Sequence, residues 1–126
     1  MKTVILFIKA NQRLINKEAF KISPVTIEEV IAKLPFVKEC VVVGVKDEKS
    51  GQLPIAFIVL NDTLLEFEEA KEKIEKICRE FLPDYEIPSY YHQLEQIPYT
   101  PNEKQDFRQL EKIGEEIVNQ KKYIKK

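Results

Sequence analysis

The sequence has 126 residues, enough for one ordinary domain with a single modest core and too few for a second independent one. Apolar residues make up 44% and charged residues 33%, a balance that argues against intrinsic disorder and against a membrane protein. Twenty Lys and Arg residues against twenty-one Asp and Glu leave a net charge of −1. No overall field therefore draws the protein to nucleic acid or to a membrane surface, and we predict neither as a partner.

The first third of the chain predicts two strands and a helix. Residues 4–8 are apolar without a break and residues 14–16 follow a polar turn, so we expect an N-terminal β-hairpin. Ser23 and Pro24 indicate a helix start, with Ser23 as N-cap and Pro24 in the first helical position. This helix should bury one face, because apolar residues recur at helical spacing at Ile27, Val30, Ile31 and Leu34.

The middle of the chain predicts two adjacent central strands and a second helix. Residues 37–45 and 55–60 are nearly continuous apolar runs, as in strands that are buried on both faces, and a charged turn separates them. Thr63, with Glu66 three residues later, resembles a capping box. The helix that follows should end by Pro83, and one of its faces is apolar at Phe67, Ala70, Ile74, Ile77, Cys78 and Phe81.

The last third predicts a short strand at residues 90–94, a proline-stiffened loop at 97–102 and a final helix. Asp106 can cap this helix, whose apolar face is Phe107, Leu110, Ile113 and Ile117. We predict a domain over residues 1–119 and a frayed basic tail over residues 120–126. The order β-β-α-β-β-α-β-α predicts an α+β fold, with three helices packed on a small mixed β-sheet and an N-terminal β-hairpin.

The cysteines and the start of the chain indicate a cytoplasmic protein. Cys40 and Cys78 lie among apolar residues, which is typical of small core side chains rather than of a disulfide framework or a metal site. The first apolar run is only five residues long and no small-residue cleavage site follows it, so we interpret it as a strand and not as a signal peptide. His92, on a predicted strand among tyrosines, should have a structural, hydrogen-bonded role.

Three segments resemble the C-terminal domain of the superfamily that includes acyl-CoA synthetases, nonribosomal peptide synthetase adenylation domains and firefly luciferase. The segment at 20–28, FKISPVTIE, is similar to the family's pattern of an aromatic, a basic, an aliphatic and any residue, a proline, and then isoleucine and glutamate. The second segment is the pair of apolar runs around the charged turn. The most specific is IPYTPNEK at 97–104, which resembles the family's proline-threonine-proline-asparagine-glycine-lysine loop.

In this family a large N-terminal domain binds ATP and a carboxylic acid, and the small domain closes over it as a lid in two orientations. The resemblance implies that Lys104 is the family's catalytic lysine, which reaches the α-phosphate and the substrate carboxylate while the acyl-adenylate forms. A fixed cation in a water-poor site opposes the negative charge of the transition state, and losing such a group typically costs about a hundred- to a thousandfold in rate.

The resemblance also implies the cofactors and partners. ATP, AMP and Mg would be bound only through a large N-terminal adenylation domain, and none of them by this chain alone. That domain would be met in trans or as the rest of a longer chain, and the final acceptor would be coenzyme A or an acyl carrier protein. The sequence itself contains no phosphate-cradling glycine-rich segment, metal-ligand spacing or nucleophile–base pair, so we predict that this chain alone catalyses nothing.

Three positions depart from the family pattern. Glu103 replaces the glycine before the lysine, and in the best alignment residues 9–12 replace the hinge motif glycine-arginine-any-aspartate, whereas an alignment with a gap would bring Arg13 into use. Residues 17–19, Lys-Glu-Ala, replace a glycine-rich turn that lets the backbone approach the pantetheine thiol. Thioester formation is therefore the half-reaction that these departures affect most.

Two other functions stay open beside the lid of an acyl-adenylate-forming ligase. The main alternative is a catalytically retired lid-like domain that acts as a protein-interaction or regulatory module, which the three departures motivate. The other is a small nucleic-acid-binding domain that uses Tyr90, Tyr91 and Tyr99, but no basic surface accompanies these side chains. Without the family resemblance, a single lysine in a turn before an amphipathic helix is normally a solvated surface charge.

Overall fold

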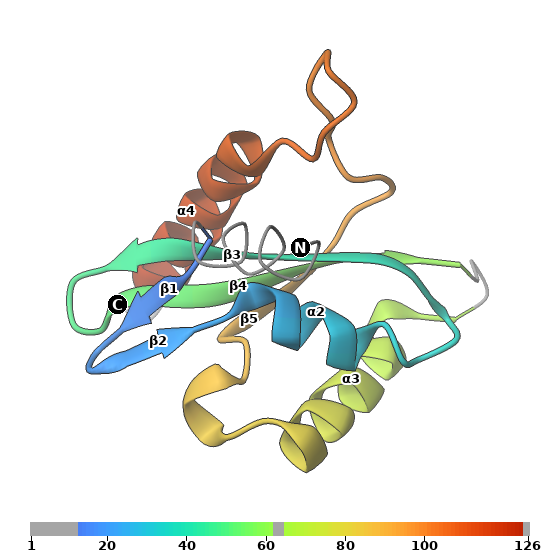
Figure 1. Cartoon of the computed structure of the whole chain (residues 1–126), viewed down its shortest axis with the longest axis horizontal. Coiled ribbons are helices and arrows are strands. Elements are labelled where there is room, and N and C mark those ends of the chain that lie inside the picture. The colour runs from blue at the N-terminus through green and yellow to red at the C-terminus, as the bar shows by residue number, and fades with distance from the viewer. Residues whose placement is uncertain (1–12, 62–64, 125–126) are drawn as a thin grey trace, which may run out of the picture.

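The computed structural model describes residues 13–61 and 65–124, with side chains up to residue 120, and shows a β-sheet between two layers of helices (Figure 1). Within this range the element order is β-β-α-β-β-α-β-α, with a short 3-10 helix, η1, before the last strand. The elements are β1 (Ile15–Lys17), β2 (Phe20–Ile22), α2 (Pro24–Ile31), β3 (Val37–Asp47), β4 (Gly51–Leu60), α3 (Phe67–Phe81), η1 (Asp84–Glu86), β5 (Tyr90–Gln93) and α4 (Phe107–Ile124). The α+β class is as predicted, and so is the order of elements from α2 onward.

Strand β4 is the centre of the sheet. It pairs antiparallel with β3 along nearly its whole length and parallel with β5 over residues 55–58 and 90–93. It also meets β1 at the pair Lys17 and Gly51, and β1 continues the sheet to β2. The sheet is therefore mixed, as predicted, and among the described strands β3 has one unpaired edge.

The N-terminal hairpin joins β1 and β2 through a two-residue turn, Glu18 and Ala19. The predicted strand at residues 14–16 corresponds to β1, whereas the predicted strand at residues 4–8 lies outside the described residues. We did not predict β2 as a strand. It has only three residues, of which only the last is buried, so it has no recognisable alternation of apolar and polar side chains.

Both faces of β3 and β4 are buried, which accounts for their unbroken apolar runs. Helices α2 and α3 cover one face and α4 covers the other (Figure 1). The core on the α2 and α3 side is Ile15, Ile22, Ile27, Val30, Ile31, Val37, Val42, Ala56, Ile58, Ile74, Cys78 and Leu82. The core on the α4 side is Val41, Val43, Val45, Ile55, Phe57, Val59, Ile97, Leu110 and Val118.

The predicted starts of the first and last helices are confirmed, and that of the middle helix is shifted. Ser23 is the N-cap of α2, although its side chain makes no capping hydrogen bond, and Asp106 Oδ1 accepts a hydrogen bond from the Gln109 N–H in the first turn of α4 (3.1 Å). Helix α3 begins after Glu66, which is itself the N-cap and not the third residue of a capping box. Thr63, the other half of the predicted box, lies outside the described residues.

The ends of the last two helices add two findings. Helix α3 ends before Pro83, as predicted, but Phe81 does not join the buried face. Its ring is 55% exposed, and the Lys33 ammonium lies 4.0 Å from the ring centroid, a cation–π contact at the surface. Helix α4 continues to Ile124, so residues 120–124 of the segment that we predicted as a tail are helical.

Both cysteines are free thiols, as predicted; Cys78 is buried in the core on the α2 and α3 side, and Cys40 is partly buried and packs against it. Burial raises the pKa of Cys40, and it raises the pKa of Cys78 to about 11, so both thiols stay protonated at neutral pH. His92 contacts the ring of Phe57 edge-on, with centroids 5.9 Å apart. Its structural contact is therefore aromatic packing.

Candidate functional site

Lys104 lies on a small hairpin loop, residues 98–106, which we call the lysine loop. It projects from the body of the domain just before α4 (Figure 1). At the base of the loop, the Asp106 N–H donates to the Pro98 carbonyl oxygen (2.9 Å). The buried side chain of Ile97 anchors one end of the loop in the core, and α4 continues from the other end. The candidate catalytic residue is therefore carried on a closed loop with two fixed ends.

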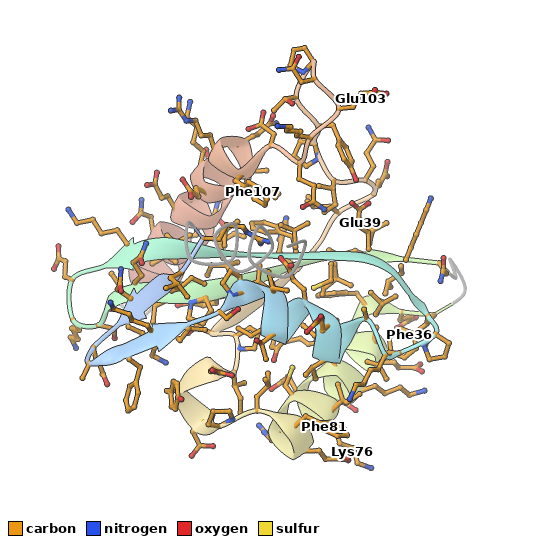
Figure 2. All side chains as sticks on the ribbon, in the orientation of Figure 1. Phe36, Glu39, Lys76, Phe81, Glu103 and Phe107 are labelled. Carbon is orange, nitrogen blue, oxygen red and sulfur yellow. The ribbon has the colours of Figure 1, made fainter. Side chains whose placement is uncertain are left out.

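The tip of this loop is a tight turn closed by backbone hydrogen bonds. The Glu103 N–H donates to the Thr100 carbonyl oxygen (2.9 Å), and the Thr100 N–H donates to the Lys104 carbonyl oxygen (2.7 Å). Glu103 has φ 63°, in the left-handed region that favours glycine, and it stands where the family pattern has glycine. The turn thus keeps the backbone shape of a glycine, at a cost of about 1 kcal/mol for a residue with a side chain. Figure 2 shows Glu103 near the outer end of the loop.

The Lys104 side chain is exposed, like the rest of the loop tip at 101–103. Among the described side chains it forms no ion pair, not even with the neighbouring Glu103 carboxylate. No described carboxylate therefore pairs with the ammonium at the end of this projecting loop, where another surface can approach it.

The base of the loop is tied to the sheet by one carboxylate. Glu39 lies on β3 (Figure 2). It accepts hydrogen bonds from the Tyr99 hydroxyl and from Gln105 Nε2 (3.2 Å), and Tyr99 and Gln105 face each other as an antiparallel bridge. The hydrogen bond to Glu39 raises the pKa of Tyr99. Our sequence analysis missed Glu39, because its contacts are 60 and 66 residues away along the chain and no local motif marks them.

A second carboxylate binds the start of the described chain. The Arg13 guanidinium donates to the Glu28 carboxylate at 2.5 Å and to the Val42 carbonyl oxygen at 3.0 Å, and the Val42 N–H donates to Glu28 at 2.7 Å. The Arg13 guanidinium carbon also lies 4.4 Å from the centroid of the Phe107 ring. Arg13 and Glu28 thus bind the N–H and carbonyl of Val42 on the unpaired edge of β3, as a further strand would.

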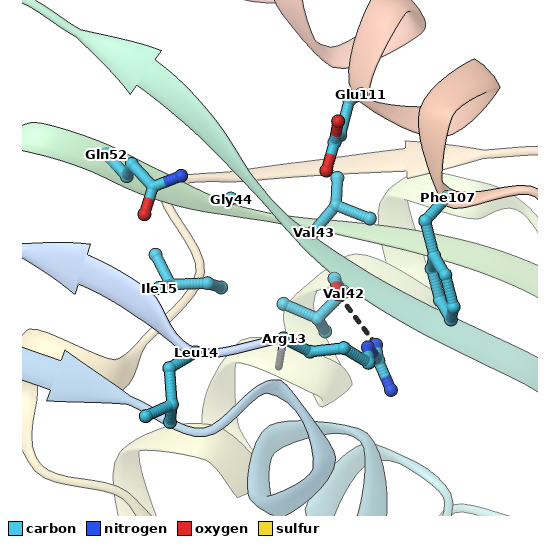
Figure 3. A pocket seen from close by; sticks show the side chains of 9 residues that line it. All are labelled: Arg13, Leu14, Ile15, Val42, Val43, Gly44, Gln52, Phe107 and Glu111. Carbon is cyan, nitrogen blue, oxygen red and sulfur yellow. Dashed lines mark hydrogen bonds between the residues drawn. The ribbon is translucent and has the colours of Figure 1, made fainter. Parts of the chain in front are cut away.

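A cavity of about 250 Å³ lies beside Arg13 (Figure 3). Its polar lining is Arg13, Gln52 and Glu111, and its apolar lining comes mainly from β1, β3 and Phe107. Neither the candidate lysine nor Glu39 lines it. Within residues 13–61 and 65–120, no three His, Cys, Asp or Glu side chains are placed to hold a metal ion. None of the helices in the described part of the chain combines the length and apolar character needed to cross a membrane.

The turn between β1 and β2 repeats the pattern seen at the lysine loop. Glu18 has φ 55°, and its N–H donates to the Ser50 carbonyl oxygen (2.6 Å). Over residues 13–61 and 65–124, Glu18 and Glu103 are the two residues other than glycine with positive φ, and each stands where the family pattern has glycine. Both turns therefore keep a backbone conformation suited to glycine but carry an exposed carboxylate side chain.

Curated relatives are longer than this chain. The 2-succinylbenzoate–CoA ligase of Bacillus mycoides (strain KBAB4) is 38% identical over 96 residues, which are 76% of this chain and 19% of the ligase. The 2-succinylbenzoate–CoA ligase of Bacillus cereus (strain AH820) matches to the same extent. The chain thus spans about a fifth of the length of the curated relatives that it matches.

Solved structures agree in fold. The o-succinylbenzoate CoA synthetase of Bacillus subtilis, in complex with its acyl-adenylate intermediate, is 30% identical, with a TM-score of 0.67 over 79% of this chain and 19% of that one. An amide bond synthetase from Marinactinospora thermotolerans is 28% identical, with a TM-score of 0.72 over 79% of this chain and 20% of that one. The family model for the AMP-binding enzyme C-terminal domain matches residues 26–104, from α2 to the candidate lysine. The chain therefore belongs to the AMP-binding enzyme C-terminal domain family.

Proposed function

We propose that this chain is the lid of an acyl-adenylate-forming ligase and supplies Lys104 to an active site formed by a large adenylation domain. The observation that carries the proposal is an exposed lysine, without an ion pair among the described side chains, on a closed loop at the end of the family match. The large domain is a separate protein or the rest of a longer chain, because this chain spans only 19% of its ligase relatives.

The chemistry assigned to Lys104 is electrostatic. When a carboxylate attacks the α-phosphate of ATP, negative charge accumulates on the phosphoryl oxygens and on the leaving pyrophosphate. An ammonium brought there by lid closure opposes that charge in a site from which water is excluded, where the interaction is much stronger than in solvent. We assign ATP, AMP and Mg to the large domain, and the role of this chain is to bring one cation to the reacting atoms.

The second half-reaction passes the acyl group to coenzyme A or to a carrier protein. In the family, a glycine-rich turn approaches the pantetheine, and here that turn contains the exposed carboxylate of Glu18. We propose that this chain supports adenylation better than thioester formation. Glu18→Gly should then raise the rate of thioester formation and leave the rate of adenylation unchanged, with both half-reactions measured separately on one enzyme.

The test of the main proposal is a chimera. This chain replaces the C-terminal domain of the Bacillus subtilis o-succinylbenzoate CoA synthetase, and ATP–pyrophosphate exchange is measured with 2-succinylbenzoate as the acid. Lys104→Ala should lower the rate of exchange by about a hundred- to a thousandfold, or roughly 3 to 4 kcal/mol of transition-state stabilisation. Lys112→Ala, which removes an exposed lysine from α4, is the matched control and should leave the rate unchanged.

The retired interaction module is the second candidate, and the two glutamates at glycine positions favour it. If the chimera exchanges no faster than the large domain alone, or if Lys104→Ala leaves its rate unchanged, the catalytic proposal is wrong and the module is supported. The module also predicts a protein partner whose affinity is the same for the wild type and for Lys104→Ala, measured by pull-down and titration.

A further inference from the structure

The hydrogen bonds of Glu39 connect both sides of the lysine loop to the sheet. Its Oε2 atom accepts from the Tyr99 hydroxyl and from Gln105 Nε2, and these two residues face each other across the base of the loop. A single carboxylate thus contacts the strand that leads to the tip and the strand that returns from it. Lys104 is the residue immediately before Gln105, one step from this contact.

Little else joins this loop to the rest of the domain. The tip residues 101–104 are exposed, and Tyr99 is 52% exposed. Apolar packing therefore fixes neither the tip nor Tyr99 against the domain. The other hydrogen bonds described for residues 98–105 join the loop to itself or to the first residues before α4. Among the described side chains, Glu39 is therefore the hydrogen-bonding link from the sheet to the loop.

We propose that Glu39 is a positioning residue that fixes the direction in which the loop presents Lys104. The inference rests on the proposed function of this lysine. Without Glu39, the loop can pivot about Ile97 and the start of α4, while its internal hydrogen bonds stay intact. Displacement of a catalytic group by about 1 Å can cost up to about a hundredfold in rate, so the position of the loop base matters for the reaction.

The same chimera tests this proposal. Glu39→Ala should lower kcat for adenylation by about ten- to a hundredfold, with the KM for ATP unchanged, because the loop acts on the transition state and not on nucleotide binding. Glu39→Gln should retain more activity, since an amide oxygen can still accept from the Tyr99 hydroxyl. Glu48→Ala, at an exposed acid in the turn between β3 and β4, is the matched control and should retain full activity.

A double variant shows whether Glu39 affects the rate of adenylation through Lys104 or independently of it. If Glu39 acts through the lysine, then Glu39→Ala should not lower the rate further when Lys104→Ala is already present. An equal loss in both backgrounds would show that Glu39 acts elsewhere, and the proposal would be wrong. If Lys104→Ala lowers the rate but Glu39→Ala does not, this inference is wrong and the proposed function stands. If Lys104→Ala leaves the rate unchanged, the proposed function itself is wrong.

A measurement on the chain alone gives a second, independent test. Backbone order parameters from NMR relaxation should fall for residues 100–105 in Glu39→Ala, while those of β3 and α4 stay at wild-type values. Tyr99→Phe, which removes only the donor hydroxyl, should cause part of the same loss of order. Unchanged order in both variants would contradict the proposal, and cooperative urea unfolding with the wild-type m-value would confirm that the variants are folded.

Discussion

Two carboxylates, Glu28 and Glu39, each hold a distant segment of chain against β3, but they do so at different depths. The Glu28 side chain is 17% exposed and binds a charged partner, Arg13, which is itself 21% exposed. Glu39 binds two neutral donors beside an exposed loop. The difference indicates that the first contact stabilises the fold, whereas the second directs a functional loop at little gain in stability.

The reason lies in what each site exposes when its carboxylate is removed. Without Glu28, the N–H of Val42 loses its acceptor inside the protein, because Val42 is completely buried, and Arg13 loses its counter-charge. Without Glu39, water can reach the hydroxyl of Tyr99, which is already half exposed. Unpaired buried groups cost much more free energy than groups that water can solvate.

The largest effect that we expect on stability is therefore from Glu28→Ala. It should lower the free energy of unfolding by about 2 to 4 kcal/mol, because it leaves a buried N–H without an acceptor and a largely buried guanidinium without its counter-charge. Urea unfolding of the 126-residue chain measures this change.

Glu29→Ala is the matched control, since Glu29 is the next residue of α2 and is exposed. It should change the free energy of unfolding by less than about 0.5 kcal/mol. Glu39→Ala should also cost less than about 1 kcal/mol. Equal losses for Glu28→Ala and Glu39→Ala would remove the distinction between the two carboxylates.

The sequence predicted the helices and the central strands well, because they bury regular apolar patterns. The runs of β3 and β4 and the helical spacing in α2, α3 and α4 reflect burial directly, and Pro83 marks the end of α3. The family pattern also marked Lys104 as the candidate catalytic residue, a role that stays a prediction. These features depend on neighbours along the chain or on residue type, and both are visible in a sequence.

Contacts between distant residues could not be predicted in the same way. The pair Arg13 and Glu28 joins residues 15 positions apart, and Glu39 meets the lysine loop 60 residues later. Only the folded sheet places these side chains together, so no spacing rule identifies them. Phe81 shows the same limit, since its helical position predicts burial but no described part of the domain buries it, and it stays 55% exposed.

The strained turn at the tip of the lysine loop, which Glu39 holds against β3, allows a test with a smaller expected change in stability. Glu103→Gly should raise the free energy of unfolding by about 0.5 kcal/mol, because relief of the left-handed strain slightly exceeds the entropy that glycine adds to the unfolded chain. Glu48→Gly is the control, because Glu48 does not have positive φ. It should destabilise the protein by up to about 1 kcal/mol, and a loss of the same size from Glu103→Gly would contradict the φ of 63°.

The smallest effect is spectroscopic and concerns the hydroxyl that Glu39 binds. Because the Tyr99 hydroxyl donates to this carboxylate, its pKa is raised in the folded state. The stabilisation from this hydrogen bond is then fully present below about pH 10, the ordinary pKa of tyrosine, and is lost as the pH rises through the higher folded value.

NMR titration of the Tyr99 ring should show this raised pKa, and Glu39→Ala should move it back towards its ordinary value, because it removes both the acceptor of the hydroxyl and the nearby negative charge. Glu48→Ala should leave the Tyr99 titration unchanged. Coincident curves for the wild type and Glu39→Ala would mean that the hydroxyl is not bound to Glu39 in solution. The loop would then lack one of its two links to β3, and the contrast between the two carboxylates would have to rest on Gln105 alone.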